Sequence, residues 1–146
     1  MGISRHFFPD RTFLLSVLHG SVDGESLKTY VLECNRDVGD AANLRELADC
    51  RRVTDLKGLS VRAAIACAGA EADRPQSKLA ILVPPDSNLM YGVARAYQTF
   101  AETRRQGARV FRNFDQAVAW LSDSAAEGLE IRALIAEAPV ENMVQG

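Results

Sequence analysis

Short runs of apolar residues alternate along the chain with apolar stripes at helical spacing. The run from Thr12 to Leu18 is apolar almost throughout, which is typical of a strand buried on both faces. Pro9 and Asp10 signal a turn just before it, so the segment ahead of them is predicted to pair with it in a hairpin. Together with three later apolar runs this predicts five strands, at residues 3–8, 12–18, 44–50, 78–83 and 108–112.

Four helices are predicted from their caps and their stripes. Asp23 is a suitable N-cap for the first helix, in which Leu27, Tyr30, Val31 and Cys34 share one face. The caps expected for the other helices are Ser60, either Asp86 or Ser87, and Asn113. The third helix is the longest, and its buried stripe is predicted to comprise Leu89, Val93, Tyr97, Phe100 and Ala101.

The connections between these elements are predicted from glycine, proline and polar residues. Gly107 is expected to end the third helix, residues 69–76 are expected to form a loop, and residues 122–128 are expected to form a linker. Residues 129–138 fit a helix or a strand equally well, and the pattern does not decide between them.

Repeated alternation of strand and helix requires crossover connections and therefore a largely parallel sheet. The predicted fold is α/β: a single domain whose mixed, mostly parallel sheet has about five strands and is accompanied by four helices. The domain is expected to span residues 1–122, with residues 123–146 as a C-terminal extension.

Composition excludes several function classes. The chain has 146 residues, 47% of them hydrophobic, and a net charge of −2, which argues against a nucleic-acid binder that works through bulk positive charge. No run is long enough to span a membrane, and the opening residues lack the apolar core of a signal peptide, so a cytoplasmic location is expected. Cys34, Cys50 and Cys67 form no C-x-x-C pair and are expected to be reduced thiols.

Motifs for catalysis are sparse, and an enzyme is not expected. The two histidines, His6 and His19, have no nucleophile elbow or acid cluster near them in sequence, and no metal or cofactor site is predicted. Glycine-rich phosphate loops are absent as well. A Cys50–His19 pair is conceivable if their strands are neighbours, and Asp49 is the acidic residue with the most apolar flanks, although it also fits the end of a strand.

Several stretches resemble the SpoIIAA-like family, small bacterial domains related to STAS and CRAL-TRIO domains. They are Leu-Ala-Ile-Leu-Val-Pro at 79–84, Met-Tyr-Gly-Val-Ala-Arg-Ala-Tyr at 90–97 and Arg-Val-Phe-Arg-Asn-Phe-Asp-Gln-Ala-Val-Ala-Trp-Leu at 109–121, with a looser match at 47–55. The resemblance spans residues 8–121 and implies a STAS-like mixed sheet with helices.

The resemblance also bears on function. The anti-anti-sigma factors among these relatives carry a phosphorylatable serine in an Asp-Ser-Ser-Gly type turn before a helix. The comparable residues 53–60 contain only Thr54 and Ser60 as hydroxyls, and Ser60 is better explained as a helix cap, so phosphorylation is not expected. CRAL-TRIO relatives carry lipids, which makes an apolar ligand a candidate.

A ligand pocket is the first site hypothesis. The third helix has an apolar face too broad for one stripe, so part of it is predicted to line a cavity against the first helix, with tyrosine hydroxyls as polar handles. Plain core packing is the alternative. The residues of this predicted pocket are Leu27, Tyr30, Val31, Met90, Tyr91, Ala94 and Tyr97.

A basic rim is the second hypothesis. Residues 95–112 contain five arginines against one glutamate, whereas residues 115–146 are mainly acidic. Arg104, Arg105 and Arg109 are predicted to form an exposed rim that meets anionic lipid headgroups or the acidic tail of a second copy.

The leading function is therefore a non-catalytic binding or regulatory module that acts through a protein partner or an apolar ligand. A carrier of a lipid or other hydrophobic molecule and, less expected, a small enzyme are the alternatives.

Overall fold

The computed structural model describes residues 2–39, 41, 43–56 and 58–138. Five strands form one sheet in the order β1-β2-β3-β4-β5. Their bounds are β1 Gly2–Phe8, β2 Phe13–Ser21, β3 Arg45–Asp55, β4 Arg74–Leu82 and β5 Arg105–Phe111. The helices are α1 Gly24–Val38, α2 Val61–Gly69, α3 Asn88–Ala101, α4 Phe114–Leu121 and α5 Ala125–Glu137, with 3-10 turns at η1 Pro9–Arg11 and η2 Glu102–Arg104.

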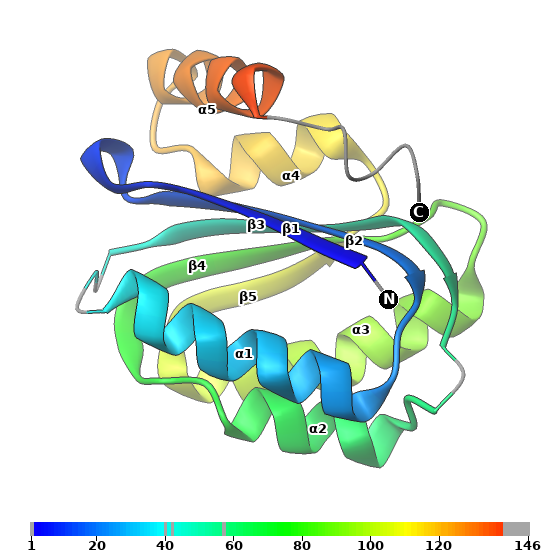
Figure 1. The fold of residues 1–146 in the computed structure, drawn as a ribbon. Coiled ribbons are helices and arrows are strands. Elements are labelled where there is room, and N and C mark those ends of the chain that lie inside the picture. Colours follow the sequence, from blue (N-terminus) through cyan, green and yellow to red (C-terminus); the bar gives the residue numbers. More distant parts are fainter. Residues whose placement is uncertain (1, 40, 42, 57, 139–146) are drawn as a thin grey trace.

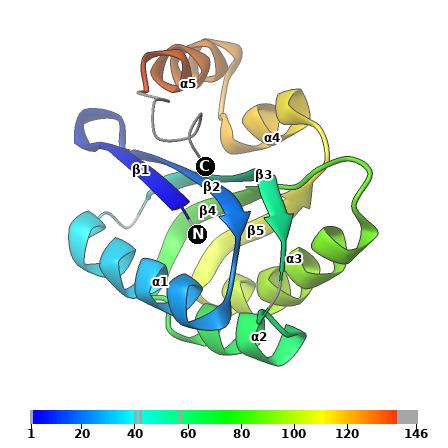
Figure 2. The ribbon, with the colours of Figure 1, turned by 45° about the vertical axis from the view of Figure 1, so that its right-hand side comes forward.

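The predicted α/β class and the five-stranded mixed sheet are confirmed. β1 and β2 form the predicted antiparallel hairpin, and every later neighbouring pair is parallel. Strand order follows chain order, so each crossover moves one strand further in the same direction. Right-handed crossovers then place α1, α2 and α3 on one face of the sheet, and α4 and α5 cover the other face (Figures 1 and 2).

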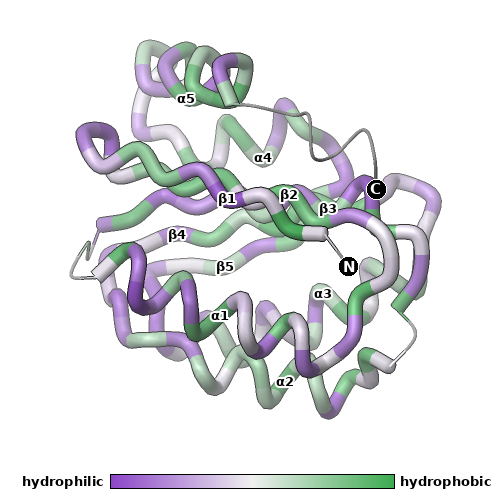
Figure 3. The backbone as a smooth tube through the Cα atoms, in the orientation of Figure 1, coloured by the Kyte–Doolittle hydropathy of each residue, from purple (hydrophilic) through white to green (hydrophobic). Residues whose placement is uncertain are grey.

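The sheet separates two apolar cores because successive strand side chains point to opposite faces. Leu18 of β2 packs into the core formed with α2 and α3. Phe13, Leu15 and Val17 of the same strand pack into the core formed with α4 and α5. Hydrophobic residues accordingly run along the strands between the helical layers, while hydrophilic residues gather in the turn after β1 (Figure 3).

The predicted helix caps are confirmed, and Ser87 rather than Asp86 caps α3. In each helix the cap side chain accepts a hydrogen bond from a backbone N–H three residues on, which satisfies one of the free donors of the first turn. The caps are Asp23, Ser60, Ser87, Asn113 and, for α5, Ser124.

Gly107 does not end the third helix as predicted. The helix α3 ends at Ala101, and Gly107 lies within β5. A Cβ atom at this position would lie 3.0 Å from Cζ2 of Trp120, so glycine here permits close packing of the indole ring against the strand.

The predicted stripe of α3 is also partly wrong. Leu89 and Phe100 are 69% and 43% exposed, whereas Met90, Val93 and Ala94 are buried. The buried face of α3 therefore begins at Met90 rather than at its neighbour Leu89.

Two predicted connections contain regular structure. β4 begins at Arg74 and includes Pro75, inside the predicted loop, where an irregular register between Arg74 and Lys78 accommodates the missing proline N–H. The predicted linker contains the start of α5, which settles the open choice at 129–138 as a helix. The described part of the chain therefore has five α-helices where four were predicted.

α5 packs on the sheet face that α4 also covers, where these two helices and the sheet enclose a core, termed the core above the sheet. Ile131 is buried there, and Leu134 and Ile135 pack against the same cluster. Residues 139–146 of the predicted extension lie outside the described residues. Among the helices described, each is too short or too polar to cross a membrane.

Candidate functional site

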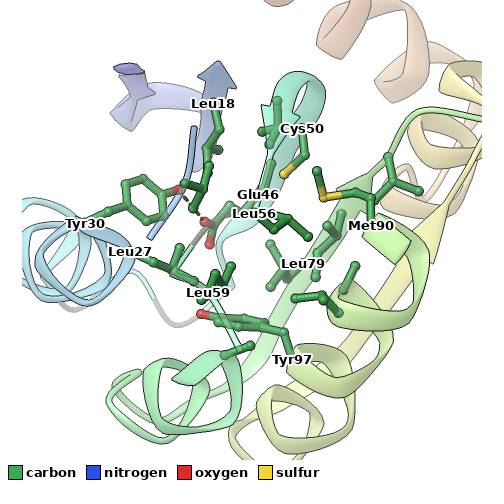
Figure 4. A pocket seen from close by; sticks show the side chains of 18 of the residues that line it. Leu18, Leu27, Tyr30, Glu46, Cys50, Leu56, Leu59, Leu79, Met90 and Tyr97 are labelled. Atoms are coloured by element: carbon green, nitrogen blue, oxygen red, sulfur yellow. Dashed lines mark hydrogen bonds between the residues drawn. The ribbon is translucent and has the colours of Figure 1, made fainter. Parts of the chain in front are cut away.

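A cavity of about 80 Å³ lies between the sheet and the helices α1, α2 and α3. Its walls come from β2, β3, β4 and these three helices, together with the loop between β3 and α2 (Figure 4). The lining is mostly apolar and includes Leu18, Leu27, Ala48, Leu59, Leu79 and Met90. Apolar, half-enclosed space with a few polar groups is typical of a small-molecule site.

Five of the seven predicted pocket residues line this cavity: Leu27, Tyr30, Met90, Ala94 and Tyr97. Val31 is buried behind Tyr30 against Cys67 instead. Tyr91 lies further round α3, where the guanidinium groups of Arg95 and Arg112 lie 5.9 Å and 4.2 Å from its ring centroid. The wall that α3 gives the cavity is formed by Met90, Val93, Ala94 and Tyr97, and the position of Tyr91 lies outside this arc of the helix.

The polar groups gather at one end of the cavity. The hydroxyl of Tyr30, from α1, points at the carboxylate of Glu46, from β3, and the hydroxyl of Tyr97 lies at the same end (Figure 4). The Tyr30 hydroxyl is 3.3 Å from Glu46 Oε2 and 2.5 Å from Ser16 Oγ, and it can donate to either. Three elements thus bring oxygen atoms to one side of an otherwise apolar space.

Arg105 joins the two buried carboxylates of this end. Its Nε donates to Glu71 Oε1 at 2.8 Å and its Nη2 donates to Glu46 Oε1 at 3.0 Å. The Tyr97 hydroxyl donates to the other oxygen of Glu71. The side chains of Arg105, Glu46 and Glu71 are buried. Buried groups keep their charge when they are ion-paired and hydrogen-bonded. Each carboxylate therefore has one oxygen on Arg105 and the other beside a tyrosine.

Burial and charge shift the acid–base properties of this cluster. Desolvation, reinforced by the Glu46 carboxylate, raises the pKa of Tyr30 well above its usual value. Desolvation and the Glu71 carboxylate do the same for the pKa of Tyr97. Burial alone would lower the pKa of Arg105, but the two carboxylates outweigh burial and hold that pKa above its usual value. Both hydroxyls and the guanidinium therefore stay protonated at neutral pH.

The loop that carries Glu71 is fixed to the end of α1. The Asn35 side chain donates to the carbonyl of Ala70 at 2.9 Å and accepts from the N–H of Ala72 at 3.1 Å. Arg74 donates to the carbonyl of Asn35 at 3.4 Å, at the last turn of α1, where free carbonyls and a cation are complementary. These bonds hold Glu71 in place beneath Arg105.

Sulfur atoms line the opposite end of the cavity. The Cys50 thiol and the Met90 thioether face each other there, with Leu56 and Leu79 nearby (Figure 4). Burial, assisted by the Asp49 carboxylate, raises the pKa of Cys50 to about 12. The thiol is therefore protonated at neutral pH and acts as a small apolar group.

The predicted basic rim does not form as a set of three exposed arginines. Arg105 is buried and ion-paired beneath the cavity. Nη1 of Arg104 lies 3.9 Å from Oδ1 of Asp73. Arg109 is exposed, and its guanidinium lies 5.7 Å from the Phe111 ring centroid. The predicted contacts with anionic lipid or a second copy therefore rest on Arg104 and Arg109 alone.

Part of the acidic segment is paired within the chain. Asp115 lies 2.8 Å from Arg132, and weaker pairs join Asp123 to Arg45 and Glu130 to Arg11. Residues 139–146, including Glu141, lie outside the described residues. Pairing within the chain reduces what this segment can offer to a second copy.

Other residues singled out from the sequence lie away from the cavity or serve the fold. Ser60 caps α2 through a hydrogen bond from Ala63 N at 3.1 Å. Thr54 is exposed near the end of β3. Asp49 is not free, because it accepts two hydrogen bonds from the Arg51 guanidinium and one from the Arg51 backbone N–H.

Glu46 and Glu71 were not predicted as site residues, and Arg105 was predicted in the exposed basic rim rather than in a buried cluster. A signal was present for Glu46, because it and Ser16 interrupt strands that are otherwise apolar on that face. Glu71 and Arg105 carry no comparable signal, since each lies in a polar stretch that reads as surface. Their partners come from other elements, which spacing along the chain does not reveal.

A scan of protein-family models and a search of curated proteins found no match to this chain. Within the described part of the chain, no cluster of three or more His, Cys, Asp or Glu residues is arranged to hold a metal ion.

Proposed function

We propose that this protein is a non-catalytic binding module that takes a small apolar molecule into the cavity between its sheet and α1, α2 and α3. The observation that carries this proposal is the cavity itself. It is a space of about 80 Å³ within the main core, and its polar groups are confined to one end. Well-packed domains contain few voids larger than a water molecule, so this space needs an explanation beyond packing.

The size of the cavity bounds the ligand. An engineered apolar cavity of about 150 Å³ binds benzene, so a guest larger than a few carbon atoms needs this cavity to widen. Met90 and Leu56 line it, and an unbranched methionine side chain adapts readily to a guest. The ligand class that fits without rearrangement is a short aliphatic chain.

Binding rather than catalysis is proposed because the polar groups at the cavity are already engaged. Catalysis at neutral pH calls for an acid, base or nucleophile with a pKa near the working pH. The pKa values of Tyr30, Tyr97 and Cys50 are all raised away from that range. Glu46 and Glu71 are both tied to Arg105.

A protein partner is less well supported as the target. The large apolar side chains exposed among the described residues come from four different helices: Leu32 on α1, Val61 on α2, Leu89 and Phe100 on α3, and Leu129 on α5. Single exposed apolar residues are ordinary on protein surfaces.

We also propose that the chain is a SpoIIAA-like domain. The sequence resemblance at 79–84, 90–97 and 109–121 supports it. So does the mixed sheet with an antiparallel first strand, which agrees with what that resemblance implies. The functional proposal does not depend on this membership, since it rests on the cavity.

Xenon under pressure tests the cavity, because it is apolar and carries no head group. Methyl resonances of residues at the cavity, Met90 and Leu79, are expected to shift in a saturable way in ¹³C NMR spectra. Methyls of the core above the sheet, such as Leu121, are expected to stay in place.

A filled cavity provides the matched variant. Ala94→Leu places a larger side chain in the cavity and is expected to abolish the xenon shifts. Ala117→Leu overpacks the core between the sheet and α4 and is expected to keep them. Absence of saturable shifts in the wild-type protein, or equal shifts in both variants, would overturn the proposal.

A further inference from the structure

The polar atoms that face the cavity offer lone pairs rather than protons. The Tyr97 hydroxyl donates its hydrogen bond to Glu71, and the Tyr30 hydroxyl donates to Ser16 or Glu46. A carboxylate accepts hydrogen bonds and donates none. The four residues of this end, Tyr30, Glu46, Glu71 and Tyr97, therefore present acceptors to anything bound in the cavity.

The positive charge of the cluster lies behind the carboxylates. Arg105 does not line the main cavity; it lines a separate space of about 10 Å³ together with Arg74. Arg105 Nη1 and Arg74 Nε have no hydrogen-bond partner in the described part of the chain, and both side chains face that second space. A ligand in the main cavity thus meets Glu46 and Glu71 before it meets a guanidinium.

The opposite end of the cavity offers no competing head-group site. Only the Cys50 thiol, a weak donor, and the Met90 thioether, a weak acceptor, are polarisable there. The asymmetry gives the ligand an orientation, with its hydrocarbon against Leu79 and Met90 and its head toward Tyr30 and Tyr97 (Figure 4).

We infer that the ligand of this cavity is a short aliphatic molecule that ends in a hydrogen-bond donor, an alcohol or an amine, and not a carboxylate. This inference rests on the proposed function and adds the class of head group. A hydroxyl or ammonium donates to the free lone pairs of Glu46, Glu71 and the tyrosine oxygens. An ionised carboxylic acid would bring a third carboxylate against the two already there.

Four molecules of similar size test the head group on the unmodified protein. They are 1-propanol, propylamine, ethyl methyl ether and propanoate, followed by ¹³C NMR titration of the Met90 and Leu79 methyls. The ether keeps an oxygen and loses the donor, so it separates donation from mere polarity. The alcohol or the amine is expected to bind at least about tenfold more tightly than the ether and propanoate, the scale of one hydrogen bond to a charged group.

Each result of the titration and of the xenon experiment either supports or overturns a stated claim. Tenfold preference for the alcohol, the amine or both supports the inference and identifies the head group. Equal binding of all four, or tighter binding of propanoate, overturns the inference while xenon binding still supports the cavity. Xenon binding with none of the four molecules bound also overturns the inference. Loss of xenon binding itself defeats the proposed function.

Two variants test which hydroxyl produces the preference for a ligand that donates a hydrogen bond. Tyr30→Phe removes a hydroxyl at the polar end and keeps the ring, so the ratio of alcohol to ether affinity is expected to fall. Tyr91→Phe removes a hydroxyl on the outer side of α3, away from the cavity lining, and is expected to leave the ratio unchanged. An unchanged ratio in Tyr30→Phe, with the protein folded, would remove Tyr30 from the head-group site.

Discussion

Arg105 sets the charge balance of the buried polar cluster, because its guanidinium bonds Glu46 and Glu71 at once. Its side chain is 4% exposed, and those of the two glutamates are 7% and 6% exposed. Desolvation makes such a group costly unless every charge keeps its partner. The residue is therefore a structural support of the cavity end and not part of a surface rim.

Removal of this guanidinium is expected to destabilise the fold strongly. Arg105→Gln leaves two buried carboxylates without a cation, which costs roughly 3–5 kcal/mol in comparable buried pairs. The free energy of unfolding in urea measures the effect. Arg109→Gln, at an exposed arginine of the same strand, is the matched control and is expected to change stability by less than about 0.5 kcal/mol. Similar small effects in both variants would show that Arg105 lies at the surface.

Tyr97 joins the apolar core and the polar cluster in one side chain. Tyr97→Ala is expected to cost roughly 3–5 kcal/mol, because a large aromatic packed against the core is truncated. Tyr97→Phe keeps the ring and loses only the hydrogen bond to Glu71, so about 1–3 kcal/mol is expected. Chemical denaturation of both variants separates the two contributions. A loss below about 1 kcal/mol for the alanine variant would mean that the ring does not pack on the core.

At the scale of elements, the two helical layers have different tasks. α1, α2 and α3 enclose the cavity on one face of the sheet, and α4 and α5 close the other face around a second apolar core. This division follows from the strand order, because three like-handed crossovers must place their helices on one side. The site therefore belongs to the layer built from the crossovers.

α5 is expected to contribute to global stability through one buried residue. Ile131 is 4% exposed in the core above the sheet, so Ile131→Ala is expected to cost about 2–4 kcal/mol. Leu129, two residues earlier on the same helix, is 69% exposed, and Leu129→Ala is expected to cost less than about 0.5 kcal/mol. Thermal or urea unfolding measures both. Equal, small effects would favour a separable extension beginning at residue 123.

At the scale of the whole molecule, several buried groups make stability depend on alkaline pH. The pKa values of Tyr30 and Tyr97 are raised by burial and by neighbouring carboxylates. Burial also raises the pKa of Cys34 to about 11 and that of Cys50 to about 12. In the unfolded chain, cysteine ionises near pH 8.5 and tyrosine near pH 10. Above these values the unfolded chain releases more protons than the folded protein, so stability falls as pH rises.

The free energy of unfolding is therefore expected to be constant from pH 7 to about pH 8 and to decline above about pH 9. Each such group contributes a slope of about 1.4 kcal/mol per pH unit once its unfolded form ionises. Urea unfolding at pH 7, 9 and 10.5 measures the decline. Tyr97→Phe removes one titrating group and should show a shallower slope above pH 10. Equal stability of the wild-type protein at pH 7 and 10.5 would contradict this account.

The sequence by itself determined the elements whose signals are local. A helix cap acts within three residues, and strand burial appears as an unbroken apolar run, so Asp23, Ser60 and Asn113 and the five strands were predictable. The same local periodicity placed Tyr30 and Tyr97 on inward faces of their helices. Local periodicity failed where the role of a residue depends on a distant partner. Gly107 is an example, because its small size matters only where Trp120 packs on it.

Only the tertiary structure decided the chemistry of the site. Arg105 is 59 residues from Glu46 and 34 residues from Glu71 along the chain, and each of the three is polar enough to fit a solvated surface. Folding brings them together because parallel strand order and the Asn35-held loop converge at one end of the sheet. Whether a charged residue is solvated or buried depends on what packs over it, and that is a property of contacts between distant segments rather than of any local pattern.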